Sequence, residues 1–173
     1  MNKAQDNRIL SDALILFGVT GDLAHKKIFP ALYTMAKNGL LRTPVVGVAS
    51  SKWRLAELRK RAADGIRKAG PIDDRPALRH LLSLMRYVDG NYNDPGTFDT
   101  LKKALSDSRH PAHYLAIPPS LFATVIKRLG SVGLADQARV IVEKPFGRDL
   151  ASARALNRVA QSVFPENAIA PPK

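Results

Sequence analysis

Residues 12–38 read DALILFGVTGDLAHKKIFPALYTMAKN, and this stretch indicates how the rest of the chain is organised. Residues 13–17 are apolar and uncharged, which is typical of a strand buried on both faces of a parallel sheet. From Asp22 onward, apolar side chains recur with the period of a helix, and Asn38 and Gly39 form a typical helix C-terminus. The sequence therefore predicts a strand that passes into a helix through a tight turn at residues 18–21.

This turn contains Gly18 and Gly21, followed by Ala24, in the pattern G-x-x-G-x-x-A. Glycine lets a ligand approach the backbone closely, and the first turn of a helix has N–H groups without intrahelical partners. Such a helix start attracts anions and suits the pyrophosphate of a dinucleotide. A glycine turn between a strand and a helix also occurs for structural reasons alone. Its place after the first strand of the chain favours the nucleotide interpretation.

The composition limits the class of protein. With 173 residues the chain has the length of one domain with its own core. It has no cysteine, which excludes disulfides, thiolate metal ligands and thiol nucleophiles, and we expect no metal site. The formal net charge of +12 fits a nucleic acid, a phosphorylated small ligand or an acidic partner domain. Without a long apolar run or a signal-peptide core, we expect a soluble, cytoplasmic protein with no membrane partner.

A second strand is predicted at residues 45–49, and Ser50, Lys52 and Arg54 follow its C-terminal end. In a doubly wound sheet this strand end lies beside the adenosine ribose of the coenzyme. The segment lacks an acidic residue to hold a free ribose hydroxyl, and its cations favour the 2′-phosphate of NADP, with NAD as a further candidate. A solvated basic loop in a basic protein is the alternative interpretation.

The rest of the chain alternates helices and strands. Helices are predicted at residues 55–68, 76–84, 95–105, 121–129 and 150–163, strands at 86–88, 113–117 and 139–143, and N-caps at Asp94 and Asp149. This alternation predicts a Rossmann-type α/β fold, a doubly wound parallel sheet with helices on both faces and ligands at the C-terminal ends of the strands. We expect the domain to span residues 13–165, between a disordered tail at 1–12 and a second tail at 166–173.

Four sequence blocks resemble one known family. They are GVTGDLAHKKIFPALY from residue 18, DGNYNDPGTF from 89, HYLAIPPSLF from 113 and RVIVEKPFGRD from 139. In this order and spacing they are similar to the coenzyme-binding domain of glucose-6-phosphate dehydrogenase, and together they cover nearly the whole chain. Composition and periodicity alone indicate only a nucleotide-binding α/β domain. The resemblance implies an NADP-dependent oxidoreductase of the pentose phosphate pathway, which oxidises C1 of glucose 6-phosphate to a lactone.

The resemblance also implies roles for individual residues. It places the coenzyme pyrophosphate on the glycine turn, and it places Lys144 near both the nicotinamide and the sugar substrate, where an ammonium donates several hydrogen bonds. The alternative for Lys144 is a solvated charge at a strand end. With Lys52, chosen for its place after the second strand, the predicted cofactor-binding residues are Gly18, Thr20, Gly21, Asp22, Leu23, Ser50, Lys52, Gly90, Asn91, Pro119, Phe122 and Lys144.

The chain departs from the family's pattern at several positions. Ser50 stands where family members have arginine or lysine, so a preference for NADP would depend on Lys52 or Arg54. Asn91 stands where they usually have an acid, and it cannot carry that charge. After residue 167 the family continues into a strand and an R-I-D-H-Y-L-G-K-E block that binds the sugar phosphate, whereas residues 168–173 of this chain do not match that block. None of the histidines, His25, His80, His110 and His113, matches the family's general base. We therefore expect no catalytic residue in this chain and an inactive isolated chain.

Two other functions stay open on the sequence. One is a non-catalytic nucleotide-binding module that assembles with a separately encoded catalytic part, and the other is a basic nucleic-acid binder. Lys and Arg are scattered over several helices without interleaved aromatic residues, which argues against nucleic acid. The expected partners are a nucleotide and, in the full-length family, glucose 6-phosphate, and a homo-oligomer also stays open.

Overall fold

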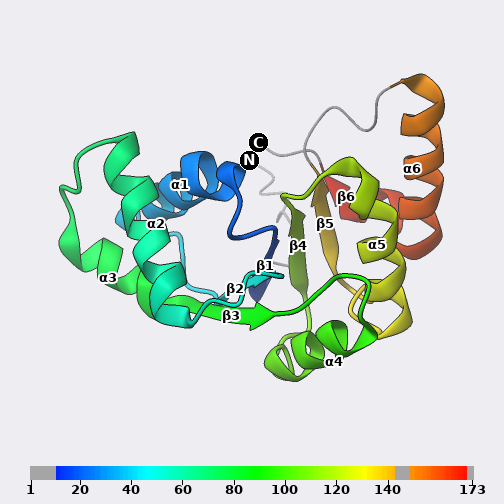
Figure 1. Cartoon of the computed structure of the whole chain (residues 1–173), viewed down its shortest axis with the longest axis horizontal. Coiled ribbons are helices and arrows are strands. Elements are labelled where there is room, and N and C mark those ends of the chain that lie inside the picture. The colour runs from blue at the N-terminus through cyan, green and yellow to red at the C-terminus, as the bar shows by residue number, and fades with distance from the viewer. Residues whose placement is uncertain (1–10, 143–148, 171–173) are drawn as a thin grey trace, which may run out of the picture.

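Six parallel strands form one sheet in the computed structural model, which describes residues 11–142 and 149–170. The strands are β1 Ala13–Phe17, β2 Val45–Ala49, β3 Met85–Asp89, β4 Pro111–Leu115, β5 Arg139–Val142 and β6 Ile169–Ala170. They lie in the order β3-β2-β1-β4-β5-β6, with every neighbouring pair parallel (Figure 1). This is the doubly wound order, so the predicted Rossmann-type fold is confirmed.

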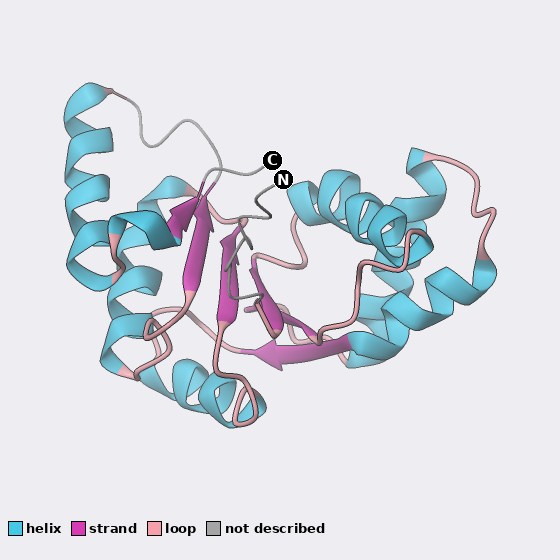
Figure 2. Cartoon of the chain, turned by 180° about the vertical axis from the view of Figure 1, so that it is seen from behind, coloured by secondary structure: helices cyan, strands magenta, loops and turns pink. Residues whose placement is uncertain are grey.

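The predicted helices are all present. The first begins as a π-helical turn, η1 Ala24–Ile28, and continues as α1 Phe29–Lys37; the others are α2 Leu55–Ala69, α3 Arg75–Leu84, α4 Pro95–Ala104, α5 Phe122–Ser131 and α6 Leu150–Val163. Two short 3₁₀ helices, η2 Pro119–Leu121 and η3 Glu166–Ala168, precede α5 and β6. In Figures 1 and 2, α1, α2 and α3 gather on one side of the sheet, and α4, α5 and α6 on the other.

Alternate side chains of β1 face the two helical layers. Ile15 and Phe17 belong to the core formed with α4, α5 and α6, whereas Leu16 belongs to the core formed with α1, α2 and α3, and all three are fully buried. The helices that follow β1 and β2 thus cover one face, and those that follow β3, β4 and β5 cover the other. The change of face occurs between β1 and β4. Ligands of such sheets bind at this switch point, outside the carboxyl ends of the strands.

Three helix ends predicted from capping residues are confirmed. The carboxylate of Asp94 accepts the N–H of Gly96 at 2.9 Å, and that of Asp149 accepts the N–H of Ser152 at 2.8 Å. Gly39 follows α1 with φ +69°, a conformation that glycine adopts without steric cost. Local chemistry is sufficient to place these three ends.

Two predicted boundaries are shifted at the start of the sheet. β4 begins at Pro111 and not at His113, because Pro111 pairs with Ala13 and the register with β1 sets the ends of β4. Asp12, assigned to a disordered tail, belongs to the fold because its carboxylate accepts the backbone N–H groups of Arg109 and His110. The remaining tail residues 1–10 lie outside the described residues.

The predicted tail at the C-terminus also joins the sheet. Ile169 pairs with Val140 and Ala170 with Ile141, so β6 adds a sixth parallel strand. A strand of two residues has no readable period in the sequence, and the edge of β5 decides that it pairs there. The domain boundary predicted at residue 165 is therefore wrong, because the fold extends to residue 170.

Candidate coenzyme site

The loops after β1, β2, β3 and β4 meet at the carboxyl edge of the sheet. Thr20 Oγ1, after β1, lies 3.0 Å from Ser51 Oγ, after β2. The N–H of Gly90, after β3, donates to the backbone oxygen of Ala49 at 2.9 Å. Predicted site residues that are distant in the sequence are thus brought together by parallel pairing, which puts all carboxyl ends of the strands at one edge.

Gly18 is required by the packing beneath the glycine turn. Its φ is +80°, and a Cβ at this position would lie 2.1 Å from the backbone oxygen of Ala116, in the loop after β4. Neither the conformation nor the space admits a larger residue. Gly18 is therefore a glycine for structural reasons, because only glycine lets the chain after β1 pass so close to the chain after β4 at the switch point.

Gly21 has a different role in the same turn. It is exposed, and its N–H donates to the backbone oxygen of Gly18 at 3.0 Å, which closes the turn before the helix starts. A Cβ here would lie 3.2 Å from that oxygen, and a larger side chain would project from the exposed turn. Asp22 is also exposed and pairs with Arg61 at 3.7 Å, while Leu23 is half-buried. A small residue at an exposed helix start is what the close approach of a phosphate requires.

Tyr92 supports the glycine turn from below, and the sequence analysis did not select it. Its hydroxyl donates to the backbone oxygen of Val48 at 2.9 Å and accepts the N–H of Gly18 at 2.7 Å. The side chain is buried, and its ring packs edge-on against Phe17. Burial raises the pKa of Tyr92 to about 12, so the hydroxyl keeps its proton at neutral pH. Arg128 of α5 holds the loop in place by donating to the backbone oxygen of Tyr92 at 3.1 Å.

Gly90 and Asn91 shape the loop that carries this tyrosine. A Cβ on Gly90 would lie 2.2 Å from Thr97 Oγ1, so glycine is required where α4 approaches the loop. The backbone oxygen of Asn91 accepts the hydroxyl of Thr97 at 2.7 Å, and its side-chain oxygen accepts the N–H of Asn93 at 2.8 Å. Both residues thus have a clear part in the structure of the loop.

The loop after β2 combines a fixed backbone with exposed cations. Ser50, Lys52 and Arg54 are all exposed. Ser51 between them contacts Thr20 through its hydroxyl, and its backbone oxygen accepts the hydroxyl of Tyr87. Burial raises the pKa of Tyr87 to about 12, so it remains a donor at neutral pH. The loop therefore holds its exposed side chains at the same edge as the glycine turn.

Phe122 is a correction to the predicted site. Its side chain is 1% exposed and belongs to the core beneath α5, because this face of the helix turns toward the sheet. A ring so deeply buried does not contact a ligand at the edge of the sheet, and its predicted role in coenzyme binding is wrong. Pro119, three residues earlier in η2, is exposed at the end of the β4 loop. Lys144, predicted for both coenzyme and substrate, lies outside the described residues.

The four histidines all have protein partners, as expected for structural roles. One contacts a carboxylate and three contact backbone oxygens; the pairs are His25 with Asp64, His80 with Leu41, His110 with Gln137, and His113 with Leu134. Within residues 11–142 and 149–170, no cluster of three or more His, Cys, Asp or Glu side chains could hold a metal ion. The helices in these same ranges are all too short or too polar to cross a membrane.

A parallel sheet in this strand order, with a glycine turn at its switch point, defines a dinucleotide-binding Rossmann domain. The family model described as "Glucose-6-phosphate dehydrogenase, NAD binding domain" matches residues 15–170. The chain therefore belongs to this family.

Relatives and solved structures agree with this assignment. Glucose-6-phosphate 1-dehydrogenase 1 of Mycobacterium tuberculosis is 41% identical over 92% of this chain, and the Saccharomyces cerevisiae enzyme is 38% identical over 95% of it. The crystal structure of the Mycobacterium avium enzyme has a TM-score of 0.89 and 41% identity over 94% of this chain. A glucose-6-phosphate dehydrogenase in complex with its substrate glucose-6-phosphate has a TM-score of 0.85 and 32% identity over the same share.

The match covers only part of each relative. The chain spans 34% of the two enzymes compared by sequence and 36% of the two compared by structure. It therefore corresponds to about a third of these proteins, the part that contains their NAD binding domain.

Proposed function

We propose that this chain binds NADP and forms the coenzyme domain of a glucose-6-phosphate dehydrogenase. The observation that carries the proposal is the exposed turn at Gly21, where the first helix begins. This turn is held in place at Gly18, which bonds to the hydroxyl of Tyr92 and packs against the backbone of Ala116. The pyrophosphate would lie at this helix start, where N–H groups and the helix dipole favour an anion. Because neighbouring loops already hold the turn, little ordering would accompany binding.

The bound coenzyme would accept a hydride from C1 of glucose 6-phosphate, the substrate named for one solved relative. The residues of this chain would bind and orient it, as proteins do for their cofactors. Lys144 is proposed to contact both the nicotinamide and the sugar, since its ammonium donates several hydrogen bonds. The histidines of this chain are already bonded to other groups, so the general base is assigned to another part of the assembled enzyme.

NADP is the proposed coenzyme in preference to NAD. The support for this choice is the pair of exposed cations Lys52 and Arg54 beside Ser50, at the strand end that lies near the ribose in such folds. An acidic residue that would grip a free ribose hydroxyl is absent from positions 50–54.

The decisive experiment is a calorimetric titration of the purified chain with NADP, on the parent and on Gly21→Val. Valine would put methyl groups where the pyrophosphate must approach, so the dissociation constant should rise about tenfold or more, roughly 1.4 kcal/mol. Gly70→Val is the matched control, because a Cβ on Gly70 meets nothing within 4 Å. Unchanged NADP affinity in a folded Gly21→Val variant would remove the glycine turn from the binding site.

An alternative function is a non-catalytic nucleotide-binding module that assembles with a separately encoded catalytic part. The observation in its favour is that all four histidines of this chain are hydrogen-bonded to protein groups, so none of them is free to act as a general base. An assay that follows NADPH formation distinguishes these two functions. On its own the chain should give no glucose 6-phosphate-dependent signal, and turnover that appears only on mixing with the separately expressed remaining two thirds of a relative would support assembly.

We also propose a cytoplasmic location and small-molecule partners, a nucleotide and a sugar phosphate. The cysteine-free sequence fits a reducing compartment. We further propose that the chain forms a homo-oligomer. Size-exclusion chromatography with light scattering would test this by measuring the mass of the purified chain.

A further inference from the structure

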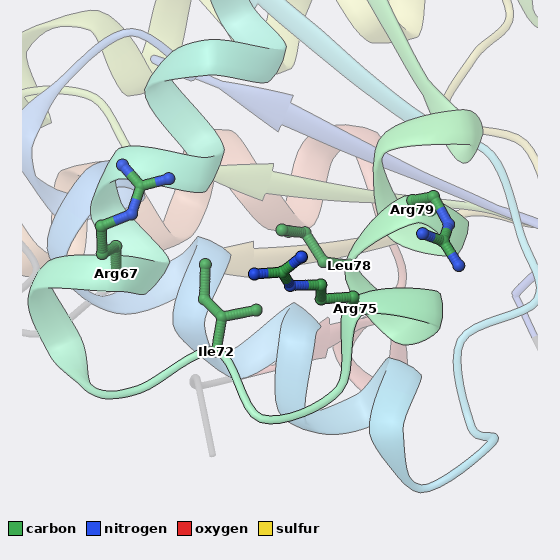
Figure 3. Close-up of a pocket in the computed structure, with 5 residues that line it drawn as sticks. All are labelled: Arg67, Ile72, Arg75, Leu78 and Arg79. Carbon is green, nitrogen blue, oxygen red and sulfur yellow. The ribbon is translucent and has the colours of Figure 1, made fainter.

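A cavity at the junction of α2 and α3 is lined by three arginines. It has a volume of about 370 Å³, and its lining consists of Arg67, Ile72, Arg75, Leu78 and Arg79 (Figure 3). We propose that this cavity is a second anion site, which binds a small molecule carrying two or more phosphate groups.

The arginine side chains have no acidic partner among the residues that the structure describes: none of the three guanidinium groups forms an ion pair or a hydrogen bond there. The carboxylates on the adjoining loop are already engaged. Asp73 accepts hydrogen bonds from Lys37 and Tyr33, and Asp74 caps α3 by accepting the N–H of Ala77 at 2.9 Å. All three arginines are exposed, so an anion can reach them from solvent, and it would neutralise part of their charge.

The chemistry of the lining selects a phosphorylated small ligand. A guanidinium donates two parallel hydrogen bonds to a phosphate, a geometry that an ammonium does not provide. Figure 3 shows the guanidinium of Arg75 beside Ile72 and Leu78, both half-buried, so the cationic groups adjoin an apolar surface. The volume lies at the lower end of the range of small-molecule sites, about 300–1,000 Å³. Because Asp74 already caps the start of α3, the guanidinium groups have to supply the attraction.

This cavity is separate from the coenzyme site. α2 begins after the carboxyl end of β2 and runs back along the sheet for about 20 Å before it reaches Arg67. The loop after α2 contacts Lys37 in the last turn of α1, a helix that also starts at the carboxyl edge. The three arginines therefore lie toward the opposite edge of the sheet from the glycine turn, and one ligand does not occupy both sites.

The test is a calorimetric titration with inorganic pyrophosphate in the Gly21→Val background, where binding at the glycine turn is weakened. We expect one saturable site, and Arg75→Gln and Arg79→Gln should each raise the dissociation constant about tenfold, as for loss of a charge-assisted phosphate contact. Arg139→Gln is the matched control, because it removes one charge from an exposed arginine on β5 and should leave the constant unchanged. Circular dichroism verifies that each variant is folded.

Two results would overturn the proposal. Binding that does not saturate, or that weakens equally in Arg139→Gln, would mean that net charge alone attracts the anion. A hexaglutamate peptide that binds these arginines more tightly than pyrophosphate would mean that the surface docks an acidic polypeptide. Failure of NADP binding would overturn only the proposed function, since the effect of Arg75→Gln and Arg79→Gln on pyrophosphate is measured in a background where the coenzyme turn is already weakened.

Discussion

Ser50 lies directly after the end of β2, and in the proposed coenzyme site an added cation there would meet the 2′-phosphate of NADP. A charge-assisted contact with a phosphate contributes roughly 1.5–3 kcal/mol, so Ser50→Arg should tighten NADP relative to NAD by about tenfold or more. Calorimetric titration with both coenzymes gives the ratio. Ser106→Arg adds the same charge at an exposed position after α4 and should leave the ratio unchanged. If Ser50→Arg does not move the ratio either, the tip of β2 is not at the ribose or another residue already holds the phosphate.

Tyr92 tests whether support beneath the glycine turn matters for binding. Tyr92→Phe keeps the ring against Phe17 but removes the hydroxyl bonded to Gly18 and Val48. We expect a loss of about 1 kcal/mol in the free energy of unfolding and a several-fold rise in the NADP dissociation constant. Tyr33→Phe is the control, because it also removes a hydroxyl hydrogen bond, to Asp73, but at the opposite edge of the sheet. An equal loss of coenzyme affinity in both variants would show that Tyr92 contributes only to general stability.

Among the elements, α4 begins at an N-cap formed by the side chain of Asp94. Asp94→Ala removes the carboxylate that accepts the N–H of Gly96, and loss of an N-cap costs about 1 kcal/mol of stability. Asp99→Ala removes an equal charge from an exposed position within α4 and should cost much less. Urea denaturation of both variants measures the difference. Equal midpoints for the two would mean that packing of Phe98 and Leu101, and not the cap, determines the start of α4.

At the scale of the whole molecule, buried His113 makes stability depend on pH. Its Nε2 donates to the backbone oxygen of Leu134 at 2.8 Å, and burial lowers its pKa from 6.5 to about 4. Between these values the unfolded chain takes up a proton that the folded chain does not, so the free energy of unfolding falls as the pH falls from 6.5 to 4. The full loss from this group is roughly 3 kcal/mol.

Urea denaturation at several pH values in this window measures the effect. His113→Phe keeps an aromatic ring beside Phe17 and Phe164 and should flatten the pH dependence, although it lowers stability at pH 7 through the lost hydrogen bond. The exposed His80 provides the control, since His80→Gln should leave the slope intact. If the free energy of unfolding of His113→Phe still falls with pH as steeply as that of the parent, the pH dependence comes from other groups.

Much of the fold could be predicted because it depends on local patterns in the sequence. The apolar run of β1, the glycine turn and the caps at Asp94 and Asp149 depend on neighbouring residues alone, and the structure confirms each. The start of β4 at Pro111 and the pairing of Ile169 with Val140 depend on a distant strand, and both differ from prediction. Register and edge pairing are therefore where prediction from sequence failed, because hydrogen bonds to a strand remote in the sequence decide them.

The sequence by itself determined the doubly wound fold and the place of the glycine turn, since period and turn chemistry are local properties. The family followed from the resemblance of four sequence blocks. Only the tertiary structure decided what lies beneath that turn. It put the hydroxyl of Tyr92 against Gly18 and turned Phe122 into the core, where a contact at the sheet edge had been predicted. It also gathered three arginines around one cavity. Which side chains meet depends on how helices pack over the sheet, and positions far apart in the chain become neighbours only through that packing.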